Sequence, residues 1–136
     1  MVSYEVVNTP PEGIFEKCHE LWGVDFNTTV FTVGNKIHSK HPLTEDLLAH
    51  EVTHVGQQTA MGDGVWWDRY FVDPAFRMEQ ELEAYRNQYK WVTDTFSDRN
   101  KQASYLVGFA RSLSGTMYGN LITFTEAMQL IKSNAR

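Results

Sequence analysis

Cysteine is nearly absent from this sequence, because Cys18 is the only one among its 136 residues. A single thiol cannot form a disulfide within the chain, and it cannot build a zinc site from several cysteines. A lone cysteine among apolar residues at helical spacing is typical of a small buried core residue, and we interpret Cys18 in this way. Any metal site in this protein therefore has to be assembled from histidine and carboxylate side chains.

Long apolar runs and basic runs are lacking as well. No stretch is long enough to span a membrane, and the N-terminus has no basic segment followed by an apolar one, as a signal peptide would have. The formal net charge is -5, which disfavours nucleic acid as a partner. We therefore expect no membrane and no nucleic acid among the partners. We expect a cytoplasmic protein, with leaderless release or a phage-associated location as the open alternative.

The composition is that of a chain that folds around one core. Hydrophobic residues make up 42% of the sequence and aromatic residues 13%, which exceeds what disordered chains contain. No internal repeat, linker or low-complexity run divides the chain. We predict a single domain over residues 1–136, of the α+β class and mostly helical. A short β-sheet should precede the helix at residues 44–58, and further helices should follow it.

The boundaries of the expected elements follow from capping residues, turn residues and the spacing of apolar residues. The expected elements are a strand at 3–7, a helix at 12–21, a strand at 27–33, a turn at 34–35, a strand at 36–39, a helix from 42 or 44 to 58, a short helix or covering loop at 65–71, a long helix from 73 to 96, a helix from 97 or 98 to 113, a loop at 114–120 and a last helix after the Thr123–Glu126 capping box. A strand before the helix at 44–58 would offer an extended peptide an edge to pair with.

One five-residue motif carries the chemistry, His50-Glu51-Val52-Thr53-His54, which reads H-E-x-x-H. Residues four apart on a helix lie about 40° apart around its axis, so His50 and His54 share one face and can bind one metal ion. Glu51 borders that face and can place a carboxylate beside a water molecule on the metal. We therefore expect Zn²⁺ as the cofactor, His50 and His54 as ligands and Glu51 as the catalytic base. The alternative is an exposed helix with two solvated histidines.

A third protein ligand is needed, and it has to be a carboxylate. No histidine and no cysteine follows His54, and a catalytic zinc ion usually takes three protein ligands and one water. Gln57 and Ala60 stand where the longer H-E-x-x-H-x-x-G-x-x-H pattern needs glycine and histidine. His38 and His41 are weaker candidates, because neither shares a helical face with His50.

Three glutamates on the long helix after residue 73 are the candidates for this ligand. The apolar stripe of that helix consists of Met78, Leu82, Tyr85, Tyr89, Val92 and Phe96. At 100° per residue, Glu81 lies about 60° from the centre of the stripe, Glu79 about 100° and Glu83 about 140°. Glu81 is nearest to the interior and is the preferred ligand, with Glu79 and Glu83 as alternatives.

Aromatic residues outside the motif have a structural and a functional interpretation. The segment Val65-Trp66-Trp67-Asp68-Arg69-Tyr70-Phe71 either packs in the core and a lid or lines a substrate pocket. Tyr118 lies in the loop at 114–120. It either packs that loop or acts as a catalytic residue by donating a hydrogen bond to an oxyanion.

The stretch H-E-V-T-H-V-G-Q-Q from His50 to Gln58, followed by E-L-E-A-Y from Glu81 to Tyr85, resembles the gluzincin zinc metallopeptidases. It is most similar to small metallopeptidase domains of bacteria and their phages, over roughly residues 28–90. The resemblance implies a minimal zincin-like domain in which Glu81 is the third ligand. The chain departs from the family at Tyr85, where an aspartate often supports a ligand histidine.

The expected function is that of a zinc-dependent metallopeptidase that hydrolyses peptide bonds in a peptide or protein substrate. One alternative is a non-catalytic module of a phage particle or secretion apparatus, in which the metal only stabilises the fold. Another is a zinc amidase that acts on the peptide crosslinks of cell walls. A deformylase would need a Glu-Gly-Cys-Leu setting, which Lys17-Cys18-His19 does not provide.

Overall fold

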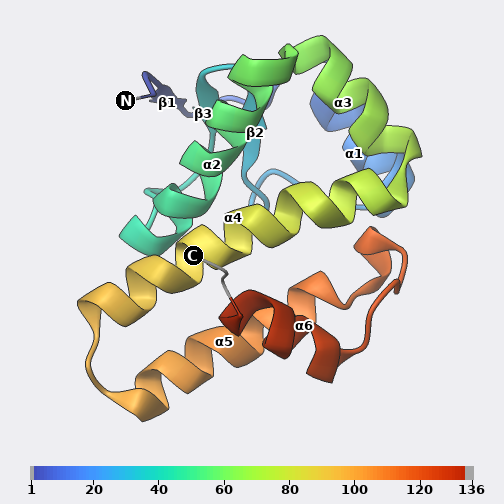
Figure 1. Cartoon of the computed structure of the whole chain (residues 1–136). Helices are drawn as coiled ribbons and strands as arrows, with labels where there is room; N and C mark the ends of the chain where they lie inside the picture. The colour runs from blue at the N-terminus through green and yellow to red at the C-terminus, as the bar shows by residue number, and fades with distance from the viewer. Residues whose placement is uncertain (1, 134–136) are drawn as a thin grey trace. The chain divides into compact units, whose positions relative to one another are not determined.

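The structure is a computed structural model that describes residues 2–133 of the chain (Figure 1). Over these residues it contains six α-helices and one three-stranded sheet, which confirms the predicted α+β class with mostly helical structure. The chain divides into two compact units, Met1–Asp68 and Arg69–Arg136. The boundary falls inside helix α3 (Asp63–Val72). The single domain over residues 1–136 stays a prediction.

The first unit contains the sheet and the helix that carries the H-E-x-x-H motif. Its elements are β1 (Glu5–Val7), α1 (Ile14–Trp22), β2 (Phe31–Val33), β3 (Lys36–His38), α2 (Glu45–Met61) and the beginning of α3. Strand β3 lies in the centre, parallel to β1 and antiparallel to β2. The predicted turn between β2 and β3 is confirmed, and Gly34 adopts a φ of 63° there. Helix α2 packs against β2 (Figure 1).

Strand β2 is shorter than the predicted strand at 27–33. Asp25 explains the difference, because its carboxylate accepts a hydrogen bond from the backbone N–H of Asn27 at 2.7 Å. The carbonyl of Asp25 also accepts from the N–H groups of Thr28 and Thr29. These bonds close a local turn, so the β-branched residues at 28 and 29 do not extend the strand.

The core of the first unit contains apolar and polar side chains. Its most deeply buried apolar side chains are Cys18, Ile37, Val55 and Trp66, and the polar Gln58 is buried to the same extent. The burial of Cys18 confirms its interpretation as a core residue and raises the pKa of its thiol from 9.0 to about 12.

Three helices pack on one another in the second unit, α4 (Pro74–Thr95), α5 (Arg99–Leu113) and α6 (Phe124–Lys132). A short 3₁₀-helix, η1 (Thr116–Tyr118), packs against α4. The N-caps of these three helices agree with the predicted helix starts, since Asp73 and Asp98 accept hydrogen bonds from backbone N–H groups of the first turn and Thr123 forms a capping box with Glu126. The buried cluster comprises Met78, Val92, Leu106, Phe109, Ala110, Leu113, Tyr118, Ala127 and Ile131.

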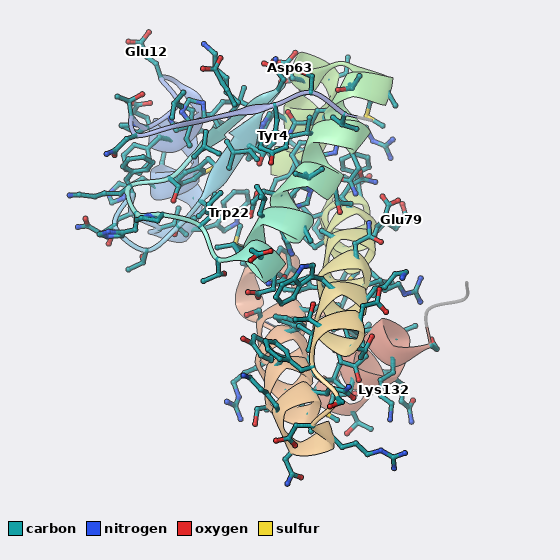
Figure 2. All side chains as sticks on the ribbon, turned by 90° about the vertical axis from the view of Figure 1, so that its left-hand side faces the viewer. Tyr4, Glu12, Trp22, Asp63, Glu79 and Lys132 are labelled. Carbon is teal, nitrogen blue, oxygen red and sulfur yellow. The ribbon has the colours of Figure 1, made fainter. Side chains whose placement is uncertain are left out.

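Some charged side chains lie on the outside of the elements, whereas Asp46, Glu51, Arg77 and Glu81 are buried. Glu12, Glu79 and Lys132 are exposed and are labelled in Figure 2. Among the described residues, no helix combines the length and the apolar character that a bilayer crossing requires.

Candidate metal centre

The two histidines of the motif lie on one face of α2, as the spacing predicts. Each is only 5% exposed, and their Nε2 atoms are 3.2 Å apart. The two rings meet edge to face, with an interplanar angle of 76°. The alternative of two solvated histidines on an exposed helix is therefore wrong.

Gln57 determines which nitrogen of His54 carries the proton. Its amide oxygen lies 2.8 Å from Nδ1 of His54, and a carbonyl oxygen only accepts hydrogen bonds. In the neutral ring, Nδ1 is then the donor and Nε2 keeps its lone pair, which is the form that binds metal ions. The ring of Trp66 packs on the same imidazole, with 5.4 Å between ring centroids. Gln57 and Trp66 thus restrain both the tautomer and the orientation of His54.

The separation of the two Nε2 atoms fits a zinc ion. Two nitrogen atoms that each bind one zinc ion at about 2.0–2.1 Å can be no more than about 4.2 Å apart, and the separation of 3.2 Å satisfies this limit. Two histidines and one carboxylate are also a donor set typical of catalytic zinc.

Glu51 is buried, with 6% of its surface exposed, and its carboxylate has a partner on the sheet. The hydroxyl of Thr32 in strand β2 donates a hydrogen bond of 2.8 Å to Oε1 of Glu51. The carboxylate of the candidate base is therefore held at Oε1, and Glu51 directly follows His50 in the chain.

Glu81 is the buried member of the three glutamates that the sequence offers, since Glu79 and Glu83 are exposed. The hydroxyl of Tyr70 donates a hydrogen bond of 2.6 Å to Oε2 of Glu81. Burial, followed by the negative charge of Glu81, raises the pKa of Tyr70 well above its ordinary value of 10.0. The phenol therefore keeps its proton and stays a donor to this carboxylate. Arg77 in turn donates from Nη1 to the carbonyl of Tyr70.

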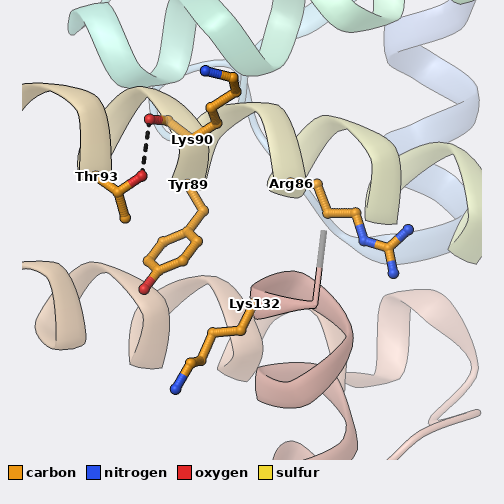
Figure 3. Close-up of a pocket in the computed structure, with 5 residues that line it drawn as sticks. All are labelled: Arg86, Tyr89, Lys90, Thr93 and Lys132. Atoms are coloured by element: carbon orange, nitrogen blue, oxygen red, sulfur yellow. Dashed lines mark hydrogen bonds between the residues drawn. The ribbon is translucent and has the colours of Figure 1, made fainter. Parts of the chain in front are cut away.

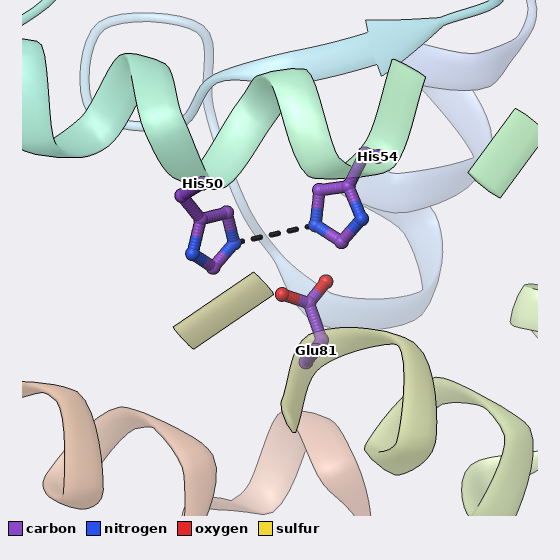
Figure 4. Close-up of side chains that lie close together, drawn as sticks. All are labelled: His50, His54 and Glu81. Atoms are coloured by element: carbon purple, nitrogen blue, oxygen red, sulfur yellow. Dashed lines mark hydrogen bonds between the residues drawn. The ribbon is translucent and has the colours of Figure 1, made fainter. Parts of the chain in front are cut away.

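Figure 4 draws His50 and His54 on α2 together with Glu81 on α4. His50 and His54 belong to the first unit and Glu81 to the second, and a metal ion shared by these three buried residues stays a prediction.

The other candidate residues have different surroundings. His38 is hydrogen-bonded through Nδ1 to the carbonyl of Thr9 at 2.7 Å, and His41 is exposed. Among the described residues, neither His38 nor His41 belongs to a group of three or more potential metal ligands. Tyr118 is buried in the apolar cluster of the second unit, which favours its packing role. Its catalytic role stays a prediction. Tyr85 also contributes to packing, since its ring lies against Phe109.

The aromatic segment at 65–71 forms a helix, α3, which settles the choice between a helix and a covering loop. Trp66 and Trp67 are 1% and 7% exposed, and Tyr70 is 3% exposed. Such burial favours the core interpretation over a pocket lined by these rings.

Polar side chains on α2 are buried along one stripe, which consists of Glu51, His54 and Gln58. Burial of such groups is costly unless each finds a hydrogen-bond partner or a metal ion. Yet no buried side-chain nitrogen or oxygen atom in the described residues lacks a hydrogen-bond partner. Protein groups therefore satisfy the hydrogen-bonding needs of this stripe.

The outer edge of β2 is covered at its centre by a side chain. Gln58 donates from Nε2 to the carbonyl of Thr32 at 2.8 Å and accepts at Oε1 from the N–H of Gly34 at 2.7 Å. The indole N–H of Trp67 donates to the same carbonyl at 3.0 Å. An extended peptide cannot pair with these two backbone groups while Gln58 and Trp67 hold them, so the expectation of an open strand edge is wrong at residues 32–34.

A pocket of about 280 Å³ lies elsewhere in the second unit and is lined by Arg86, Tyr89, Lys90, Thr93 and Lys132 (Figure 3). Two of its cations have partners, because Arg86 donates to the carbonyl of Leu130 and Lys90 pairs with Asp94. The pocket holds none of the predicted site residues.

Comparison of the chain with protein-family models, with curated proteins and with solved structures finds no match. The site therefore has to be interpreted from its own residues.

Sequence reasoning missed three residues that hold the candidate site in place, namely Thr32, Gln57 and Tyr70. Only Gln57 left a local signal, because a residue three positions after a histidine on a helix can reach its ring.

Proposed function

We propose that this protein is a zinc-dependent metallopeptidase of the gluzincin type. His50, His54 and Glu81 hold the zinc ion in this proposal, and Glu51 is the general base. The observation that carries it is the pair of buried Nε2 atoms 3.2 Å apart on α2, with the hydrogen-bonded carboxylate of Glu51 next to His50 in the chain. The peptide substrate and the cytoplasmic location are predictions from the sequence.

The proposed role of each residue follows from the chemistry of its side chain. A zinc ion at this position supplies Lewis acidity, which lowers the pKa of water and polarises the scissile carbonyl. Glu51 accepts the proton that the attacking water gives up and then delivers it to the leaving nitrogen. One water is added across the C–N bond, and a carboxylate and an amine are released. Gln57 keeps His54 in the tautomer that offers Nε2, and Tyr70 orients the carboxylate of Glu81.

Replacement of Glu51 by glutamine tests the role of the base. We expect Glu51→Gln to keep its zinc, because the three ligands are unchanged, and to lose activity by at least about 100-fold, since general acid–base catalysis contributes about that much or more. Bound zinc is measured by metal analysis and cleavage with fluorescein-labelled casein.

Glu45→Gln is the matched control, because Glu45 lies exposed in the first turn of the same helix. It should retain both zinc and activity. Cleavage by Glu51→Gln at the rate of the unaltered chain would contradict the assignment of the base.

One observation favours a second function, a module in which the metal only stabilises the fold. All buried polar side-chain atoms in the described residues have partners, as in a structural site that needs no open position for a substrate. In that case the unaltered chain binds zinc and unfolds at a higher temperature with it, but cleaves no casein. Release of peptide fragments from purified cell walls, without casein cleavage, would instead indicate the amidase.

A further inference from the structure

Thr32 contacts the proposed base from a strand that is far from the motif in sequence. It lies in the middle of β2, is 3% exposed and donates its hydroxyl hydrogen to Oε1 of Glu51 at 2.8 Å. The two residues are 19 positions apart in the chain. The bond therefore joins the sheet to α2 at Glu51, the residue that transfers protons in the proposed reaction.

The backbone of Thr32 is held on both sides of its strand. On one side, β2 pairs with β3, where Phe31 lies opposite His38. On the other side, the carbonyl of Thr32 accepts hydrogen bonds from Gln58 at 2.8 Å and from Trp67 at 3.0 Å. Threonine is also stiff at χ1, because it is β-branched. Both the backbone and the side chain of Thr32 thus have little freedom to move, so the position of its hydroxyl is restrained.

We propose that Thr32 is a positioning residue that fixes the carboxylate of Glu51 in the orientation needed for proton transfer. This inference rests on the proposed function of Glu51 as the base. The last torsion of a glutamate side chain is broad, so an unrestrained carboxylate rotates easily. A hydrogen bond to Oε1 fixes the plane of the carboxylate and with it the direction of Oε2. Misplacement of a reacting group by about 1 Å lowers a rate by about 100-fold.

Thr32→Val and Thr32→Ser separate this role from simple packing. Valine keeps the shape of threonine and removes the hydroxyl, whereas serine keeps the hydroxyl. With zinc-loaded protein and labelled casein, we expect Thr32→Val to lower kcat about 10- to 100-fold with little change in KM or zinc content. Thr32→Ser, which keeps the hydroxyl, should retain most of the kcat of the unaltered chain. Thr28→Val, the same replacement at an exposed position before β2, should leave kcat unchanged.

A second measurement needs neither zinc nor a substrate. In the zinc-free chain, Thr32→Val should lower the midpoint of thermal unfolding when Glu51 is present, because a buried hydrogen bond is lost. In the Glu51→Ala background the same replacement should not lower it, because the hydroxyl has already lost its acceptor.

The outcomes distinguish failure of this inference from failure of the proposed function. Unchanged kcat in Thr32→Val, equal losses in Thr32→Val and Thr32→Ser, or equal shifts of the unfolding midpoint in both backgrounds would each overturn the positioning role. If the unaltered chain cleaves no casein, the proposed function fails, and the unfolding experiment still decides whether Thr32 restrains Glu51.

Discussion

Tyr70 restrains the one proposed ligand that lies outside the motif. Its hydroxyl donates to Oε2 of Glu81 at 2.6 Å, while Arg77 binds the carbonyl of Tyr70 and donates from Nε to the carbonyl of Met117. The phenol that orients Glu81 is thus tied to η1 through a buried guanidinium. Partners of this kind reduce the freedom of a ligand before the metal arrives.

Removal of the Tyr70 hydroxyl should weaken zinc binding. We expect Tyr70→Phe to lower the affinity for zinc by about 10-fold, the lower end of what the loss of a ligand's hydrogen-bond partner costs. Competition with a fluorescent zinc chelator measures the change. Tyr4→Phe is the control, because Tyr4 is 40% exposed. Equal zinc affinities for Tyr70→Phe and the unaltered chain would show that this bond does not orient the ligand.

The motif residues could be predicted from the sequence because their relation is local. A spacing of four places His50 and His54 on one face of any helix, and the structure confirms this. The wheel argument also identified Glu81 as the inward glutamate of its helix. Thr32 could not be found in this way, because its bond to Glu51 depends on how β2 packs against α2.

At the scale of elements, capping residues predicted helix starts better than residue preferences predicted strands. Asp73, Asp98 and Thr123 cap the helices that the sequence assigns to them, because a cap acts within its own first turn. Thr44 precedes α2 as predicted, but its side chain forms no capping hydrogen bond. The strand at 27–33 was overestimated, since the turn at Asp25 competes for the same residues.

The capping box of α6 should contribute measurably to stability. Thr123 accepts from the N–H of Glu126 at 3.1 Å, and the carboxylate of Glu126 accepts from the N–H of Thr123 at 2.8 Å. We expect Thr123→Ala to lower the free energy of unfolding by about 1 kcal/mol, as measured by urea denaturation. Thr125→Ala, at an exposed position inside α6, should have no such effect. Equal losses in the two variants would rule out the cap as the cause.

At the scale of the whole molecule, the division at α3 is a feature that composition does not reveal. Hydrophobic content and length predict that a chain of this size folds, but they do not show how its contacts are partitioned. The proposed ligands His50 and His54 belong to the first unit, and Glu81 belongs to the second. Zinc binding should therefore depend on the folded state of the whole chain.

Removal of zinc should destabilise the folded protein. A ligand that binds only the folded state at about 100 times its dissociation constant adds about 2.7 kcal/mol to the free energy of unfolding. We expect EDTA to lower the midpoint of thermal unfolding of the zinc-loaded chain and to have no effect on His50→Ala. Calorimetry in the presence and absence of EDTA measures both shifts. An unaltered chain that is insensitive to EDTA would speak against a resident metal.

The side chain of Gln58 also hinders strands of other molecules from pairing with the edge of the sheet. Exposed strand edges recruit strands of other molecules and start aggregation. On β2, the carbonyl of Thr32 and the N–H of Gly34 are both bonded to one buried amide. A second molecule would have to displace that amide before it could add a strand at these residues. Gln58, four positions after His54, thus hinders strand addition at residues 32–34 of β2.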